Sequence, residues 1–154
     1  MAETRAKDIM NKEVITIHKH ASIEKLSSLL LKHEISGVPV VDDQGNMIGV
    51  VTEGDIIVKD ADLQFPTYFK LLDSIIYLES LSKFKRNLKK HMGTQVEDIM
   101  SKNVVTVDQE TPVNKIANIM TSKNINRVPV VDQDKNLVGI VTRADLIKSM
   151  TEQE

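Results

Sequence analysis

The sequence of 154 residues contains no cysteine and no tryptophan. The missing thiols exclude a disulfide framework and a metal site built on thiolates. The formal charge is only −2, so long-range attraction to nucleic acid or to anionic lipid is not expected. No apolar run approaches the ~20 residues that span a bilayer, and the start, MAETRAKDIM, has no apolar signal segment. We therefore expect a soluble, intracellular and cytoplasmic protein that binds neither nucleic acid nor membrane.

Aromatic residues are scarce as well, and all of them lie between residues 58 and 96. They are Phe65, Tyr68, Phe69, Tyr77 and Phe84. Pro66 is suited to open one helix there, and a second helix is predicted to begin near Ser80 or Ser82. The apolar surface of this helical connector is expected either to pack on the protein's own core or to contact a partner subunit. Its basic residues are interpreted as a solvated helix face.

The rest of the chain is an internal duplication. Residues 7–57 align with residues 97–147 at an offset of 90 without a gap, and 19 of the 51 pairs are identical. A gapless repeat of this length indicates two copies of one structural unit. We divide the chain into a first repeat (1–57), the connector (58–96) and a second repeat (97–154).

Each copy carries the signals of a β-α-β-β-α unit. Short β-branched runs predict strands, and Ser22 and Thr111 are suited to cap the helices that follow, with Pro112 at the first helical position. The predicted strands are 14–17, 38–41 and 47–51 in the first copy and 104–107, 128–131 and 137–141 in the second. Short helices are expected after Thr52 and Thr142, ending near Ile57 and Ile147. One unit would leave an apolar face bare, so we expect two units packed around a pseudo-two-fold axis in an α/β (α+β) fold.

The pattern Thr-x-x-Asp recurs at Thr52–Asp55 and Thr142–Asp145. One interpretation is a capping box, in which the threonine and the aspartate satisfy backbone amides at the start of a helix. The other is a ligand site, because a helix start favours a phosphate and an aspartate can accept hydrogen bonds from two ribose hydroxyls. Both copies use aspartate where capping boxes prefer glutamate or glutamine, which favours the second interpretation.

These motifs together resemble a known family. The combination of Val-Pro-Val-Val-Asp, Gly-(Val/Ile)-Val-Thr-x-x-Asp and an opening Asp-Ile-Met, present in both copies, is similar to a pair of CBS (cystathionine β-synthase) domains. The resemblance implies a module that binds AMP, ADP, ATP or S-adenosyl compounds in clefts between its two units, and that often forms a disc-shaped homodimer. It implies ribose contacts by Asp55 and Asp145 and phosphate contacts by Thr52 and Thr142. It also implies that the ligand pocket is lined by Thr16, Ile17, Gly37, Val38 and Pro39, and by Thr106, Val107, Arg127, Val128 and Pro129.

The two copies differ in charge near these motifs. Arg127 stands where the first copy has Gly37, and Arg143 stands where it has Glu53. Two cations favour a phosphate-bearing ligand. We therefore expect the ligand anchored by Asp145 to be held more tightly than the one anchored by Asp55.

Other chemistry finds little support in the sequence. His18 and His20 could share a strand face as metal ligands, but we interpret them as a solvated strand end and assign no metal site. No nucleophile stands beside a base in a catalytic motif, so we assign no catalytic residue. The predicted function is a regulatory CBS pair that senses adenine nucleotides and acts on an unidentified protein. The alternatives are an interaction module without ligand, a sensor of S-adenosylmethionine or cyclic dinucleotides, and a small hydrolase that uses Asp55 or Asp145.

Overall fold

The computed structural model describes residues 3–59 and 94–152, which form two compact units. One unit is Ile15–Val104, and the other combines Met1–Val14 with Val105–Glu154. Both predicted helices of the connector lie outside the described residues. In the described part of the chain, no helix has the length and apolar character to cross a membrane.

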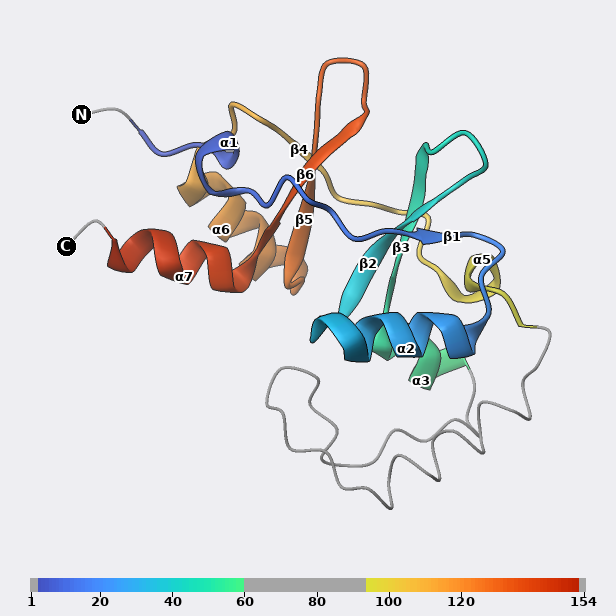
Figure 1. Ribbon diagram of the computed structural model, residues 1–154. Helices are drawn as coiled ribbons and strands as arrows, with labels where there is room; N and C mark the ends of the chain where they lie inside the picture. The colour runs from blue at the N-terminus through green and yellow to red at the C-terminus, as the bar shows by residue number, and fades with distance from the viewer. Residues whose placement is uncertain (1–2, 60–93, 153–154) are drawn as a thin grey trace. The chain divides into compact units, whose positions relative to one another are not determined.

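The unit Ile15–Val104 contains a three-stranded sheet in the order β1-β2-β3 (Figure 1). β2 lies in the centre, parallel to β1 and antiparallel to β3. The hydroxyl of Ser22 accepts a hydrogen bond from the backbone N–H of Lys25 at 3.0 Å and so caps α2. The described elements are β1 (Ile17–His18), α2 (Ile23–His33), β2 (Gly37–Val41), β3 (Met47–Thr52), α3 (Glu53–Lys59) and α5 (Val96–Ile99).

The other unit repeats this arrangement, with a sheet in the order β4-β5-β6. Its register is that of the first sheet shifted by 90 residues, since Arg127 pairs with Thr142 just as Gly37 pairs with Thr52. Its elements are α1 (Ala6–Ile9), β4 (Val107–Asp108), α6 (Val113–Lys123), β5 (Arg127–Val131), β6 (Leu137–Thr142) and α7 (Arg143–Thr151).

The predicted β-α-β-β-α order is confirmed in both copies, with three local corrections. Helix α7 continues to Thr151 instead of ending near Ile147. The opening strands predicted at 14–17 and 104–107 are wrong in position, because only Ile17–His18 and Val107–Asp108 pair with the neighbouring strand. Pro112 is the N-cap of α6 rather than its first helical residue, because its ψ of 145° is extended. The four-residue helices α1 and α5 were not predicted.

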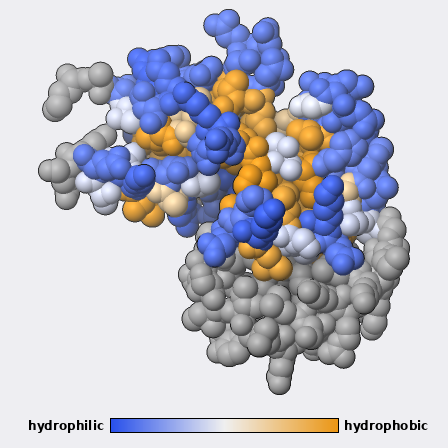
Figure 2. All heavy atoms as spheres, in the orientation of Figure 1, coloured by the Kyte–Doolittle hydropathy of each residue, from blue (hydrophilic) through white to orange (hydrophobic). Residues whose placement is uncertain are grey.

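Each unit has its own apolar core. In the first unit, Leu26 and Leu30 of α2 pack with Val38, Val40 and Val51 of the sheet, all at most 1% exposed. The second core repeats this pattern with Ile116, Met120, Val128, Val130 and Val141. Full burial of each such side chain stabilises the fold by roughly 1.5–3 kcal/mol. Figure 2 shows apolar residues gathered over the strands and hydrophilic residues over the two hairpin turns.

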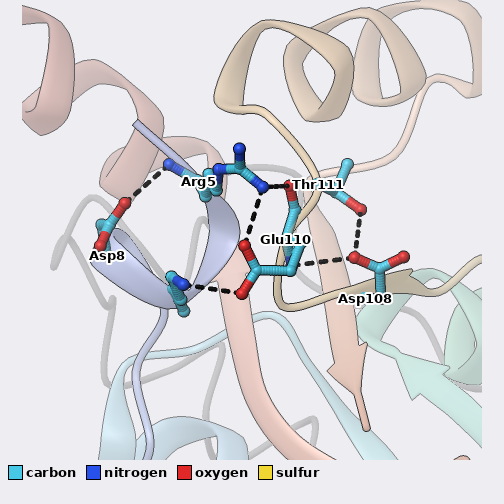
Figure 3. Close-up of polar contacts among 6 residues, drawn as sticks. Arg5, Asp8, Asp108, Glu110 and Thr111 are labelled. Carbon is cyan, nitrogen blue, oxygen red and sulfur yellow. Dashed lines mark hydrogen bonds and ion pairs between the residues drawn. The ribbon is translucent and has the colours of Figure 1, made fainter. Parts of the chain in front are cut away.

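The opening segments of the two repeats are exchanged. Residues 3–14 pack on the second repeat, where Ala6 is fully buried in the core and its N–H donates to the carbonyl of Thr111 at 2.8 Å. The equivalent segment of the second repeat packs on the first, where Val96 is fully buried and its N–H donates to Ala21 at 2.9 Å. Figure 3 shows the polar contacts of the first segment, in which Arg5, just before α1, and a side chain of α1 converge on Glu110.

A glycine lets each opening segment lie close to a sheet. A Cβ at Gly49 would come within 2.7 Å of both the Met100 sulfur and the Ser101 carbonyl oxygen. A Cβ at the equivalent Gly139 would collide with the side chain of Met10. Close packing therefore favours the glycine of the Gly-(Val/Ile)-Val-Thr motif in both repeats.

Candidate functional site

Each Thr-x-x-Asp motif forms a reciprocal set of hydrogen bonds. The N–H of Thr52 donates to Asp55 Oδ2 at 2.9 Å, and the N–H of Asp55 donates to Thr52 Oγ1 at 3.3 Å. The same bonds join Thr142 and Asp145 at 2.8 and 3.3 Å. The threonine hydroxyls also donate to Oδ2, at 3.3 Å in the first pair and 2.9 Å in the second. Both motifs are thus capping boxes, as one interpretation of the sequence predicted.

Capping nevertheless uses one carboxylate oxygen in each pair. Within the described residues, the hydrogen bonds to Asp55 and to Asp145 all end on Oδ2. Both side chains are only half buried. The remaining oxygen, Oδ1, has the lone pairs to accept two hydroxyl donors from a ligand.

The strand register brings further predicted residues to each pair. Gly37 opens β2 directly opposite Thr52, and Arg127 opens β5 directly opposite Thr142. The backbone N–H of Arg143 donates to the carbonyl of Asn126 at 3.0 Å, which ties the start of α7 to the start of β5. In each repeat, the Thr–Asp pair and the start of the central strand therefore lie at the same end of the sheet. We call this end of the strands the Thr–Asp edge.

The other predicted residues differ in what they present at the surface. The side chains of Ile17, Val38, Val107 and Val128 belong to the cores and are between 0 and 7% exposed. Pro39 and Pro129 are buried as well. These six residues can offer a ligand mainly backbone groups and an apolar wall. Thr16 and Thr106 lie just before β1 and β4, half buried and exposed respectively, so their side chains are accessible.

The charge difference between the copies lies at the same edge. Arg127 is half buried in β5, and Arg143 is exposed in the first turn of α7. The first repeat has Gly37 and the half-buried Glu53 in these places. A helix N-terminus such as that of α7 attracts anions, so helix and cations act in the same direction in the second repeat.

The carboxylates with a clearly lowered pKa lie elsewhere. The backbone N–H of Asn46 donates to Asp42 at 2.9 Å and is the main reason that the pKa of Asp42 lies below its ordinary value. Asp132 has the same turn geometry, and the N–H of Asn136 lowers its pKa in the same way. These two aspartates hold the hairpin turns, so their charge has a structural role.

A surface hollow in the first unit was not predicted. It is lined by Lys19, Ile48, Glu97, Asp98, Met100 and Lys102. None of these residues belongs to the predicted ligand site. Four of the six, Glu97, Asp98, Met100 and Lys102, come from the exchanged segment, which the linear repeat pattern assigned to the other copy.

The arrangement of both repeats matches an established family. The CBS domain family matches residues 6–62 and 96–152, which together make up most of the chain. The chain belongs to the CBS domain family. Its two CBS domains correspond to the two sequence repeats and carry the two Thr–Asp edges.

Relatives with known sequences include both small and large proteins. The CBS pair is 33% identical over 151 residues to the uncharacterized protein MJ1426 of Methanocaldococcus jannaschii, covering 94% of this chain and 89% of that protein. It is also 33% identical to the L-aspartate semialdehyde sulfurtransferase of the same organism, but covers 93% of this chain and only 22% of that enzyme. The similarity to the enzyme therefore concerns less than a quarter of its length.

A solved structure supports the fold over the whole length. The CBS domain pair of protein MJ0100, in complex with 5′-methylthioadenosine and S-adenosyl-L-methionine, is 29% identical to this chain. It has a TM-score of 0.71 and covers 99% of this chain and all of that one. The three-stranded mixed sheets with their helices are thus the CBS architecture.

Proposed function

We propose that this CBS pair is a non-catalytic regulatory module that binds an adenosine-containing ligand, with Asp55 and Asp145 accepting hydrogen bonds from the ribose. The observation that carries the proposal is the duplicated Thr–Asp pair, in which both aspartates are half buried and the hydrogen bonds of the described residues end on Oδ2 rather than on Oδ1. The ligands bound to the CBS pair of MJ0100 both contain adenosine, which supports the ligand class.

Within this class, we propose AMP, ADP or ATP as the ligand. Arg127 and Arg143 lie at the second edge, where the anionic phosphates of a nucleotide would be attracted. S-Adenosylmethionine carries a sulfonium cation instead, which these arginines would repel. The charge of the second edge therefore favours nucleotides over S-adenosyl compounds.

The ligand would act by shifting a conformational equilibrium. A ligand can do so only if it binds one conformation more tightly than another. A regulated protein would then recognise the favoured conformation. Binding across a cleft between the repeats, the homodimer and the cytoplasmic location stay predictions from the sequence.

The test is calorimetric titration of the full chain, freed of bound ligand by unfolding and refolding, with AMP, ADP, ATP, S-adenosylmethionine and 5′-methylthioadenosine. Asp55→Asn and Asp145→Asn keep the side-chain shape but lose the charge that accepts both ribose hydroxyls. We expect the double variant to bind the preferred ligand about 10- to 100-fold more weakly, because charged hydrogen bonds of about 1.5–3 kcal/mol are lost.

The chain offers matched controls for capping. Asp8 and Asp98 also accept a backbone N–H at 2.8 Å at the start of a short helix, but lie outside the predicted site. Asp8→Asn and Asp98→Asn should leave the affinity unchanged. If no ligand binds, or if the control variants weaken binding as much, the interaction module becomes the better interpretation. Release of phosphate from ATP would instead favour the hydrolase.

A further inference from the structure

Two histidines and an aspartate gather at the other end of the first repeat's sheet. His18 ends β1, His20 lies in the turn that follows, and Asp43 lies in the β2–β3 hairpin turn. His18 Nε2 lies 2.7 Å from Asp43 Oδ1, and the imidazole rings are 5.2 Å apart between centroids. One possible ligand atom from each residue lies within 4.8 Å of the other two.

This cluster is separate from the candidate nucleotide edge. His18 pairs with Val41 at the end of β2, whereas Thr52 pairs with Gly37 at its start. The cluster was missed in the sequence because Asp43 lies 25 residues from His18 and only the hairpin brings it back. Two histidines alone had suggested a solvated strand end.

We propose that His18, His20 and Asp43 bind a divalent transition-metal ion such as Zn²⁺. Two imidazole nitrogens and a carboxylate oxygen are a common ligand set for Zn²⁺, with water in the fourth position. Metal–ligand distances of about 2.1 Å place two ligands of a tetrahedral ion about 3.4 Å apart. The observed atoms are close enough to adopt this spacing through small rotations of exposed side chains. His18, His20 and Asp43 are 38, 49 and 66% exposed in their side chains, so an ion can reach them.

The backbone beneath the cluster is well fixed. The N–H of Lys19 donates to the carbonyl of Val41 at 3.0 Å and extends the pairing of β1 with β2. Asp42 accepts the N–H groups of Gln44 and Asn46 at 3.0 and 2.9 Å, which holds the turn that carries Asp43. Such preorganisation lowers the cost of assembling a metal site.

Glu97 is suited to supply a further oxygen. Its Oε1 lies 3.6 Å from His20 Nε2, close to the separation of two ligands on one ion. Glu97 belongs to the exchanged segment that packs on this repeat. An ion held by His20 and Glu97 would therefore also join this segment to the sheet.

Metal binding has one identifiable cost. The N–H of His20 donates to His18 Nδ1 at 3.1 Å, so a neutral His18 carries its proton on Nε2 and donates it to Asp43. An ion on Nε2 takes the place of this proton and moves it to Nδ1. The bond from His20 is then lost, and we expect this loss to weaken the affinity by up to about tenfold.

The second repeat has the same hairpin turn but other side chains. Asp108, Glu110 and Gln133 occupy the three equivalent positions. Glu110 is engaged by Arg5 and Lys7 at 2.8 and 2.7 Å, and Asp108 accepts a backbone N–H at 2.8 Å. The proposed site is therefore specific to the first repeat.

The test is calorimetric titration of the untagged full chain with Zn²⁺ alone, without nucleotide. We expect saturation at one ion per chain, and a loss of affinity of about tenfold or more in each of His20→Gln and Asp43→Asn. His33→Gln removes an exposed histidine of α2 and Asp134→Asn an aspartate of the other turn. These control variants should bind as the native chain does.

A second measurement keeps the result clear if a variant is less stable. In the native chain, Co²⁺ should broaden the NMR signals of the His18 and His20 rings before those of His33. Zn²⁺ binding that is weaker than about 1 mM, or equal in the cluster variants and the controls, would overturn the proposal. So would selective broadening at His33. Nucleotide binding is measured separately, so either proposal can fail without the other.

Discussion

At the scale of single residues, Asp55 and Asp145 show how one side chain can combine a structural role with a proposed binding role. The sequence posed capping and ligand binding as alternatives. The structure places the capping bonds on Oδ2 in both repeats, which leaves Oδ1 for the proposed ribose contact. The two interpretations are therefore compatible, and only a substitution that spares the cap can separate them.

The first prediction concerns the difference in nucleotide affinity between the Thr–Asp edges of the two repeats. We expect Asp145→Asn to weaken nucleotide binding about tenfold more than Asp55→Asn, because Arg127 and Arg143 attract phosphate and Glu53 repels it. Titration of each single variant with the preferred nucleotide measures the two losses. A greater loss in Asp55→Asn would show that the tighter site depends on the first repeat.

At the scale of elements, the sequence predicted the strands and helices whose apolar residues form the cores. The central and return strands were placed within one residue, because their β-branched aliphatic residues form the cores. The helices α1 and α5 were missed because a helix of four residues is too short to show an apolar periodicity in the sequence. The exchange of the opening segments was not predicted, because both segments have the same apolar pattern and differ mainly in their charges. The capping boxes were predicted from Thr-x-x-Asp, whereas the histidine–aspartate cluster depends on a turn that brings distant residues together.

Charge distinguishes the exchanged pairing from the alternative. Lys7 and Glu97 are equivalent in the alignment, as are Glu110 and His20. The structure pairs Lys7 with Glu110 at 2.7 Å and Glu97 with His20 at 3.6 Å. Without the exchange, Lys7 would face His20 and Glu97 would face Glu110, so two acids would be opposed. The charges thus favour the exchanged arrangement.

The second prediction tests this charge pattern. Lys7→Glu should lower Tm by a few degrees, because it opposes two carboxylates. Adding Glu110→Lys should restore part of the loss, because the new lysine faces an acid at position 7 but also faces Arg5. Chemical denaturation of the native chain, both single variants and the double variant gives the coupling free energy between positions 7 and 110. Additive effects would contradict a role for this pair.

The same pair supplies a pH control. The hydrogen bond from Lys7 is the main cause of the lowered pKa of Glu110. The ionised Glu110 therefore stabilises the folded state fully above its unfolded-state pKa. This stabilisation is lost as the pH falls through the lower folded-state pKa of Glu110. The coupling should be present at neutral pH and vanish in acid.

At the scale of the whole molecule, each compact unit combines residues from both sequence repeats. Ala6 completes the core of the second repeat and Val96 that of the first, and both are fully buried. A cut at the boundary of the linear repeats would leave each core without its opening segment. The spatial units are therefore not the sequence repeats, although the CBS domains follow the repeats along the chain.

The third prediction uses these two residues as a matched pair. Ala6→Asp and Val96→Asp each bury an unpaired charge, which should destabilise the unit concerned by about 3 kcal/mol or more and speed its amide exchange about a hundredfold. Hydrogen-exchange mass spectrometry should show Ala6→Asp acting first on residues 105–151, although they are distant from Ala6 in the sequence. Val96→Asp should act first on residues 17–52. If Ala6→Asp instead exposed residues 17–52 first, the opening segment would belong to its own repeat in solution, and the exchanged assembly would be wrong.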